Sequence, residues 1–318
     1  MMNDCVKLNS REMAEFAANG LLRLDGIVPN EINRRFLADA GHIDTPYGEK
    51  GSNRTVKSQG NLMARSKLPE VRPGTVLNSA YKETTALGKL VRLPVVRGAI
   101  ESLVGPESLV DHHFLHLALP SSYYKAAGIP QRSQHTHQDS TIDPRRAFDI
   151  QLFYFPHEVG LDMGGTRYVP GTHLRIVSES AIARYQNIRG QQHVVCPAGT
   201  LILMHHGVWH GGGINRTGEA RYMFKIRLNP SIPQVRLWDT SDLSARDFEQ
   251  RPIFFRKEAT NPNDIASLLT HPQPWFEGDT GRLEYINRIR FWRYLLGDEN
   301  FDADYWVTRI ENEPSASV

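Results

Sequence analysis

Residues 135–140 read His-Thr-His-Gln-Asp-Ser, and the pair His137 and Asp139 within this stretch decides how the rest of the chain is interpreted. On an extended strand, side chains at positions i and i+2 point to the same side, so these two can hold one metal ion. A third ligand must come from another strand, and His210, far downstream, is the candidate. Two histidines and one carboxylate on one face of a metal leave the opposite positions open for substrates and O₂. The stretch therefore predicts a metal site built on strands.

Short apolar segments separated by glycine and proline surround this stretch on both sides. The expected strands are residues 21–24, 114–119, 148–155, 167–169, 193–196, 200–204 and 222–228. Many short strands with turn residues between them are typical of an antiparallel sandwich or barrel, and about eight strands fit a jelly roll. We therefore predict a mainly β fold with flanking helices, built on a double-stranded β-helix core of the cupin-like, jelly-roll kind.

The N-terminal part, residues 1–110, is expected to contain helices and one long loop. An Asn-x-x-Glu capping box at residues 9–12 predicts the first helix. Residues 77–104 look helical as well, although Pro94 must break or kink them. Residues 41–75 are rich in Gly, Ser, Asn, Lys and Pro and show no steady period. A loop of this length is either a lid over a functional site or a mobile surface loop.

The C-terminal part, residues 231–318, is expected to be a helical extension. Residues 283–295 repeat apolar side chains every three residues, which predicts an amphipathic helix that Gly297 ends. The arginines of this helix are expected on a solvated or salt-bridged face. Together these parts predict a single domain over residues 1–318, with residues 111–230 as its core.

The composition is that of an ordinary globular enzyme and excludes few partners. The chain has 318 residues, 40% of them hydrophobic and 23% charged, and a net charge of +2. No run of Lys and Arg interleaved with aromatic residues stands out, so nucleic-acid binding is not expected. Two distant cysteines favour a reducing cytoplasm over a disulfide framework. No apolar run predicts a signal peptide or a membrane span.

Four stretches, in this order along the chain, carry a resemblance to a known family. They are FAANGLLRLDGIVP (16–29), HQDS (137–140), GGTRYVPGTH (164–173), and Gly-Thr at 199–200 followed by HGGGINRT (210–217) and Arg221. Through these motifs the chain resembles the phytanoyl-CoA dioxygenase family of iron(II)- and 2-oxoglutarate-dependent oxygenases. The resemblance covers roughly residues 13–230.

The resemblance implies a role for each matched position. His137, Asp139 and His210 would bind Fe(II), and Arg221 would hold the far carboxylate of 2-oxoglutarate. A planar guanidinium meets a carboxylate with two parallel, charge-assisted hydrogen bonds, so the residue type suits this task. Gln134 resembles a position that helps to hold the cosubstrate in some relatives. Ascorbate is a further candidate cofactor.

The implied reaction is the hydroxylation or other oxidation of a small organic molecule by O₂, with succinate and CO₂ as coproducts. Related iron halogenases lack the carboxylate found here at Asp139, so halogenation is not favoured. The candidate residues of the substrate pocket are His135, Tyr124, Phe153 and Trp209. His135 is alternatively only a polar residue of its strand.

Two other classes of function fit parts of the same pattern. The first is a cupin-type metalloenzyme, an isomerase or a dioxygenase, that does not use 2-oxoglutarate. The second is a catalytically inactive jelly roll that serves as a binding module. The pattern also leaves open whether the substrate is a CoA thioester or a free small molecule, and whether the protein is a homodimer.

Overall fold

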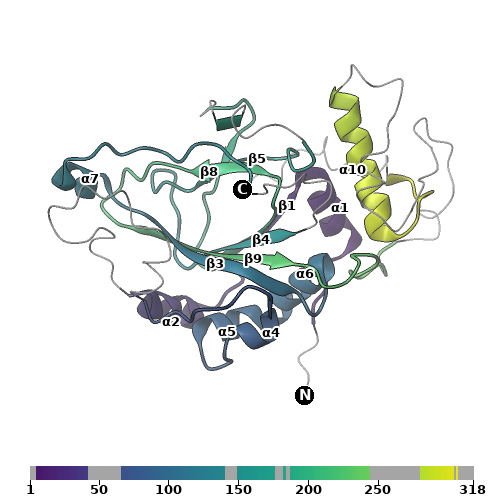
Figure 1. Ribbon diagram of the computed structural model, residues 1–318, viewed down its shortest axis with the longest axis horizontal. Coiled ribbons are helices and arrows are strands. Elements are labelled where there is room, and N and C mark those ends of the chain that lie inside the picture. Colours follow the sequence, from purple (N-terminus) through teal and green to yellow (C-terminus); the bar gives the residue numbers. More distant parts are fainter. Residues whose placement is uncertain are drawn as a thin grey trace.

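Two antiparallel sheets make up the centre of the computed structural model, which describes residues 5–41, 66–139, 149–175, 182–183, 187–243, 280–303 and 306 (Figure 1). The strands are β1 (Leu21–Leu24), β2 (Thr75–Val76), β3 (Leu109–Ala118), β4 (Ile150–Phe155), β5 (Thr166–Val169), β6 (Gln192–His193), β7 (Thr200–His205), β8 (Trp209–Gly212) and β9 (Arg221–Asn229). The larger sheet has the order β1-β7-β4-β9-β3-β2, and the smaller has the order β6-β5-β8. The mainly β fold with a double-stranded β-helix core is therefore confirmed.

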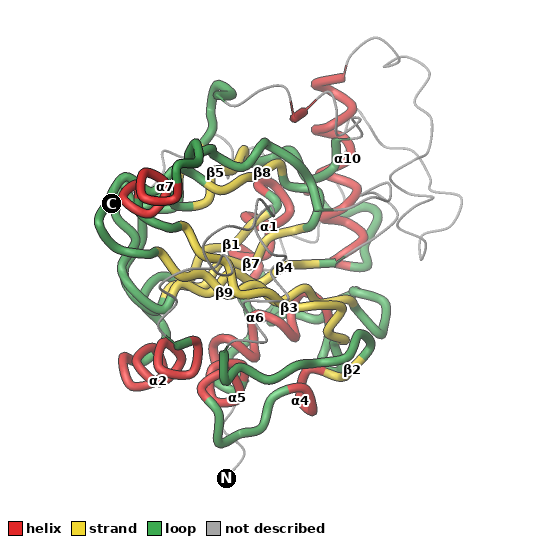
Figure 2. The backbone as a smooth tube through the Cα atoms, turned by 60° about the vertical axis from the view of Figure 1, so that its left-hand side comes forward, coloured by secondary structure: helices red, strands yellow, loops and turns green. Residues whose placement is uncertain are grey.

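Helices cover the outer face of the larger sheet. The described helices are α1 (Ser10–Asn19), α2 (Asn30–Ala40), α4 (Leu77–Ala80), α5 (Ala86–Val91), α6 (Pro94–Val104), α7 (Ser121–Ala127) and α10 (Thr280–Leu296). Figures 1 and 2 show α2, α4 and α5 on the side of this sheet that faces away from β5 and β8. Phe36 of α2 packs edge-on against Tyr154 and Phe224 of the sheet, with ring centroids 5.1 and 5.5 Å apart. Burial of such aromatic side chains contributes about 1.5–3 kcal/mol each.

The alternation of side chains along β9 separates the core from the space between the sheets. Phe224 and Ile226 are fully buried in the cluster that packs on the helices. Arg221, Met223 and Lys225 alternate with them and therefore point to the opposite face, toward the smaller sheet. This alternation puts charged side chains inside the molecule, between the two sheets, where a site can be built.

The expected helices are confirmed in most respects. Asn9 and Glu12 form both bonds of the capping box of α1, and Pro94 begins α6 at a position where its missing N–H costs nothing. β8 was not predicted, because two of its four residues are glycines. Residues 42–65 of the expected lid lie outside the described residues.

The C-terminal helix α10 narrows the prediction of a solvated or salt-bridged arginine face. Arg290 and Arg293 are each only 8% exposed, so these two side chains are not solvated. The Nε of Arg293 donates to the carbonyl of Phe301 at 2.9 Å, and Trp292 stacks on Trp238 with ring centroids 5.1 Å apart. In the part of the chain that the structure describes, no helix has the length and apolar character needed to cross a membrane.

Candidate metal centre

His137 and His210 lie directly opposite each other on neighbouring extended segments. Each backbone N–H donates to the carbonyl of the other residue at 2.9 Å. Residues that face each other in this way project their side chains to the same side, and the two imidazole rings are 4.5 Å apart. Asp139, two residues after His137, is tied to the same region because its backbone N–H donates to the carbonyl of His206 at 3.2 Å.

The three side chains converge on one point. Nε2 of His137 is 3.6 Å from Oδ1 of Asp139, and Nε2 of His210 is 3.3 Å from Oδ2 of the same carboxylate. One possible ligand atom from each residue lies within 4.8 Å of the other two. Among the described residues, this is the one group of histidines, cysteines and carboxylates arranged so that it could hold a metal ion.

Backbone carbonyls set the orientation of both imidazoles. Nδ1 of His137 lies 3.0 Å from the carbonyl of His135, and Nδ1 of His210 lies 2.9 Å from the carbonyl of Val208. A carbonyl can only accept, so each Nδ1 donates its proton to the backbone and each Nε2 faces Asp139 and the shared point. This arrangement is typical of histidine ligands to metals, whose second ring nitrogen is fixed by a hydrogen bond.

The electrostatics of the cluster keep the carboxylate ionised. Burial alone would raise the pKa of Asp139, but the charge of His210, hydrogen bonds from both histidines and the Lys225 ammonium hold that pKa far below its usual value. Burial lowers the pKa of His210 and favours its neutral form. Burial opposes protonation of His137 as well, but its hydrogen bond to Asp139 leaves its pKa raised. An ionised carboxylate with imidazole nitrogens fits a divalent cation such as Fe(II).

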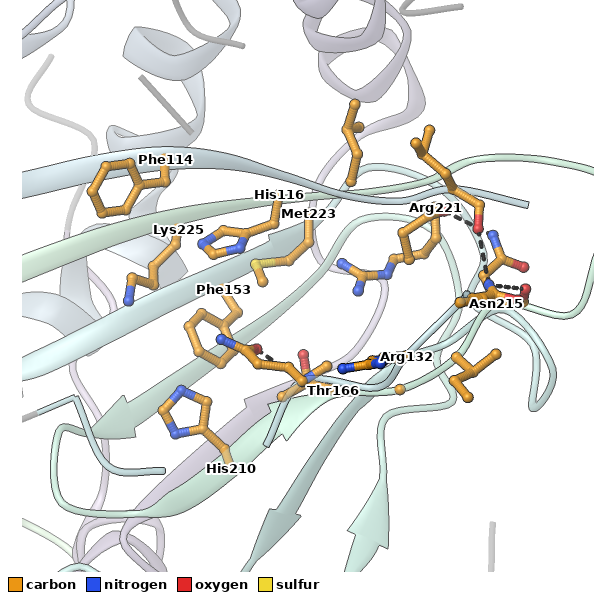
Figure 3. A pocket seen from close by; sticks show the side chains of 18 of the residues that line it. Phe114, His116, Arg132, Phe153, Thr166, His210, Asn215, Arg221, Met223 and Lys225 are labelled. Atoms are coloured by element: carbon orange, nitrogen blue, oxygen red, sulfur yellow. Dashed lines mark hydrogen bonds between the residues drawn. The ribbon is translucent and has the colours of Figure 1, made fainter. Parts of the chain in front are cut away.

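Arg221 lies at the other end of the same cavity (Figure 3). It is the first residue of β9, it is only 4% exposed, and burial lowers the pKa of its guanidinium to about 10. Nη2 donates to the carbonyl of Gly164 at 3.0 Å, whereas Nε and Nη1 are buried without a hydrogen-bond partner. Buried donors left unsatisfied are costly, so two such groups on one guanidinium indicate an anionic ligand that accepts hydrogen bonds from it.

Two consecutive glycines allow the strands around the site to approach closely. Gly164 has a φ of +69°, and a Cβ atom there would lie 2.7 Å from the backbone N of Asn215. A Cβ on Gly165 would overlap the carbonyl oxygen of Val194. This close approach brings the carbonyl of Gly164 within reach of Arg221, which explains why the Gly-Gly pair belongs to the motif.

The cavity measures about 370 Å³ and lies between the two sheets. The residues of the expected site that line it are His137, Asp139, His210, Arg221, Gln134, Tyr124 and Phe153. Gln134 accepts from the backbone N of Gly212 at 3.0 Å, which fixes its side chain against β8. His135 and Trp209 are not part of the lining. His135 is exposed, and the Trp209 ring lies under the guanidinium of Arg175 at 5.4 Å.

The structure adds residues that the sequence did not single out. The most notable is Lys225, whose Nζ donates to Oδ2 of Asp139 at 2.8 Å. It lies four residues after Arg221 on the same face of β9, so the strand alternation was the signal that could have found it. Arg132, Thr166 and Asn215 also line the cavity.

The site is thus that of a mononuclear metal enzyme with two histidines, one carboxylate and a separate buried arginine. The family model described as phytanoyl-CoA dioxygenase (PhyH) matches residues 16–223. The chain belongs to this family of iron(II)- and 2-oxoglutarate-dependent oxygenases. The cofactors of the family, Fe(II) and 2-oxoglutarate, fit the donor set and the buried guanidinium described above.

Several solved structures are similar to this chain, whereas no curated protein sequence matches it. The 2-oxoglutarate-dependent carbocyclase SnoK from nogalamycin biosynthesis is 15% identical with a TM-score of 0.49, over 70% of this chain and 85% of that chain. HygX from Streptomyces hygroscopicus with nickel and 2-oxoglutarate is 12% identical with a TM-score of 0.47, over 71% and 88%. The non-heme monooxygenase ThoJ in its apo form is 17% identical with a TM-score of 0.44, over 68% and 76%.

Proposed function

We propose that the protein is an Fe(II)- and 2-oxoglutarate-dependent dioxygenase that hydroxylates or otherwise oxidises a small organic molecule, with succinate and CO₂ as coproducts. The observation that carries the proposal is the buried guanidinium of Arg221, with two unsatisfied donors, in the same cavity as the His-Asp-His cluster. The same observation favours 2-oxoglutarate use over a cupin-type enzyme without it, because the cosubstrate brings a carboxylate for these donors.

Each side chain of the site has a distinct task in this proposal. His137, Asp139 and His210 would hold Fe(II) through two Nε2 atoms and a carboxylate oxygen. Arg221 would bind the far carboxylate of 2-oxoglutarate, whose other end would chelate the metal. Bound Fe(II) and 2-oxoglutarate supply the oxidising power by coupling the reduction of O₂ to oxidative decarboxylation.

The remaining side chains orient the reactants and limit water. Gln134 is fixed at the edge of the cavity and would contact the cosubstrate. Phe153 and Tyr124 would form part of the substrate wall, with His135 and Trp209 as further candidates outside the described lining. Apolar walls exclude water and hold one bond of the substrate beside the metal. A cytoplasmic location, a homodimer and a role for ascorbate stay predictions.

An anaerobic titration of the metal-free protein tests the proposal. Fe(II) and 2-oxoglutarate are added while the visible charge-transfer band of the iron–2-oxoglutarate chelate is recorded. We expect the band in the wild-type protein and not in His137→Ala. Iron binding without the band would favour the cupin-type alternative, and absence of any binding would favour an inactive binding module.

A further inference from the structure

Lys225 is a buried cation at the centre of the larger sheet. In the register of the sheet it faces Phe114 of β3 on one side and Phe153 of β4 on the other. Its residue exposure is 6%, and its Nζ lies 5.9 Å from the centre of the Phe114 ring. Figure 3 shows its side chain at the end of the cavity that holds His210, away from Arg221. An ammonium in this position is enclosed by aromatic walls on both sides.

The charges of the cavity do not balance among its described residues. Lys225, Arg132 and Arg221 carry positive charge, and Asp139 alone carries negative charge. Asp111 and Asp149, two carboxylates outside the lining, do not supply the missing negative charge. Arg227 is already paired with Asp149 at 2.5 Å and with Asp111 at 3.4 Å. Both carboxylates are thus engaged by Arg227.

Binding of the proposed cofactors leaves the same excess. The far carboxylate of 2-oxoglutarate would balance the positive charge of Arg221. Asp139 and the near carboxylate would together balance the two positive charges of Fe(II). Asp139 is then shared between Fe(II) and Lys225, and the described lining offers no second carboxylate to balance Lys225 or, at its exposed edge, Arg132. A buried charge is costly unless it is paired, so the loaded cavity favours a ligand that brings a negative charge.

We infer that the substrate is an organic anion with an apolar body, and that Lys225 binds its anionic group. This inference rests on the proposed function and names the substrate class of the same site. Phe114, Phe153 and Met223 lie on the same face of the sheet as Lys225 and provide the apolar walls. Arg132 approaches from the loop before His137 and contributes a second, more exposed positive charge.

Binding of the anionic group by Lys225 also determines where the substrate lies. Nζ of Lys225 is 2.8 Å from Oδ2 of Asp139, which is itself a candidate metal ligand. An anion paired with Lys225 is therefore held beside the metal, and the carbon atoms next to it are presented there. Lys225 acts in this way as a residue that determines specificity, because a neutral analogue would leave it with Asp139, which the metal also uses, as its sole counter-charge among the described residues of the lining.

A binding experiment with matched pairs of ligands tests the inference. The protein is loaded with Ni(II), which keeps the oxidation from proceeding, and with 2-oxoglutarate, whose binding is measured first. Phenylacetate is then compared with phenylacetamide, octanoate with octanamide, and phenyl phosphate with phenol, by calorimetry. We expect each anion to bind at least tenfold more tightly than its neutral partner, with an advantage that falls as NaCl is added.

Variants show which side chain causes the preference for anionic over neutral ligands. Lys225→Met should reduce the advantage of the anions to less than threefold, and Lys225→Arg should retain it. Arg132→Gln, at an exposed position that does not endanger folding, should reduce it in part. Lys89→Met, a matched substitution on the exposed surface of α5, should change nothing. The affinities for Ni(II) and 2-oxoglutarate are measured for every variant.

The outcomes separate this inference from the proposed function. If 2-oxoglutarate does not bind to the metal-loaded protein, the proposed function fails, and the inference fails with it. If 2-oxoglutarate binds but no anion does, or the neutral partners bind equally well, the inference is wrong and the proposed function stands. If Lys225→Met weakens Ni(II) binding and leaves the preference for anions intact, Lys225 only positions Asp139, which also contradicts the inference.

Discussion

Arg221 makes the chemistry of the site testable at the level of one side chain. Its Nε and Nη1 are buried donors without partners, and a carboxylate of 2-oxoglutarate would accept from this guanidinium. Hydrogen bonds to charged groups contribute roughly 1.5–3 kcal/mol each. Arg221→Gln should therefore raise the concentration of 2-oxoglutarate needed for half-maximal succinate production by roughly 10- to 100-fold or more.

The control for this prediction is Arg216→Gln. Arg216 precedes β9 in the same segment, but its side chain is 67% exposed and only 4.0 Å from the equally exposed Asp162. This variant should keep the wild-type requirement for 2-oxoglutarate. An Arg221→Gln enzyme with an unchanged requirement would show that the guanidinium does not bind the cosubstrate.

At the scale of residues, the sequence predicted those parts of the site that depend on fixed spacing. His137 and Asp139 are two positions apart, and this spacing alone places them on one side of an extended segment. Lys225 was not found, because a lysine in a strand reads as an exposed or edge residue when its neighbours across the sheet are unknown. Its position between Phe114 and Phe153 depends on the pairing of three strands that are distant in the chain.

At the scale of elements, the contact between β5, β6 and β8 depends on residues that have no side chain. A Cβ on Gly165 would overlap the carbonyl oxygen of Val194, and a backbone carbonyl cannot move aside as a flexible side chain can. Overpacking of this kind costs about 1–3 kcal/mol, and sometimes more. Gly165→Ala should therefore lower the free energy of unfolding by at least about 2 kcal/mol and weaken metal binding.

Gly218→Ala is the matched control for this element. Gly218 lies in the turn before β9, where a Cβ would meet nothing within 4 Å and no positive φ is required. Alanine there restricts the unfolded chain, so this variant should be neutral or more stable by about 0.4–1 kcal/mol. Urea unfolding of both variants measures the difference. Equal stability of the two would mean that the strands around Gly165 can separate without cost.

Elements with a strong local signal were predicted, and those made by pairing were not. The capping box of α1 and the break at Pro94 are local features, and both were found in the expected places. β8 contains two glycines and becomes a strand because β5 pairs with it along its whole length. The burial of the α10 arginines also depends on tertiary contacts and could not be predicted locally. Arg293, for example, donates to the carbonyl of Phe301, which only the folded structure brings near it.

At the scale of the whole molecule, the number and pattern of short strands predicted the class of fold. The assignment of strands to two sheets was not predicted, because β1 pairs with β7, and β3 with β9, across long stretches of sequence. The division of the chain into three parts, with the core at residues 111–230, stays a prediction. β1, β2 and the N-terminal helices already show that residues before 111 contribute to the larger sheet and its cover.

The buried histidines make the stability of the whole molecule depend on pH. Burial lowers the pKa of His113 to about 4 and that of His205 to about 3, and it lowers the pKa values of His173 and His206 well below normal. Below the ordinary pKa of about 6.5, the unfolded chain binds protons that the folded protein does not bind. The stabilisation from each of these histidines is therefore complete above pH 6.5 and is lost as the pH falls toward the lowered value. The raised pKa values of His137 and Asp149 act in the opposite direction.

We expect the free energy of unfolding of the metal-free protein to fall as the pH is lowered from 7 to 5, because the histidines with lowered pKa values are more numerous. Each contributes a slope of up to about 1.4 kcal/mol per pH unit. His205→Asn isolates one of them, since the amide oxygen can replace Nδ1 as the acceptor for the backbone N–H of Gly207. This variant should show a slope between pH 6 and 5 that is smaller by about 1.4 kcal/mol per unit. His193→Asn, at an exposed position, should keep the wild-type slope. Urea unfolding at a series of pH values measures all three proteins, and identical slopes would show that His205 titrates equally in the folded and the unfolded chain.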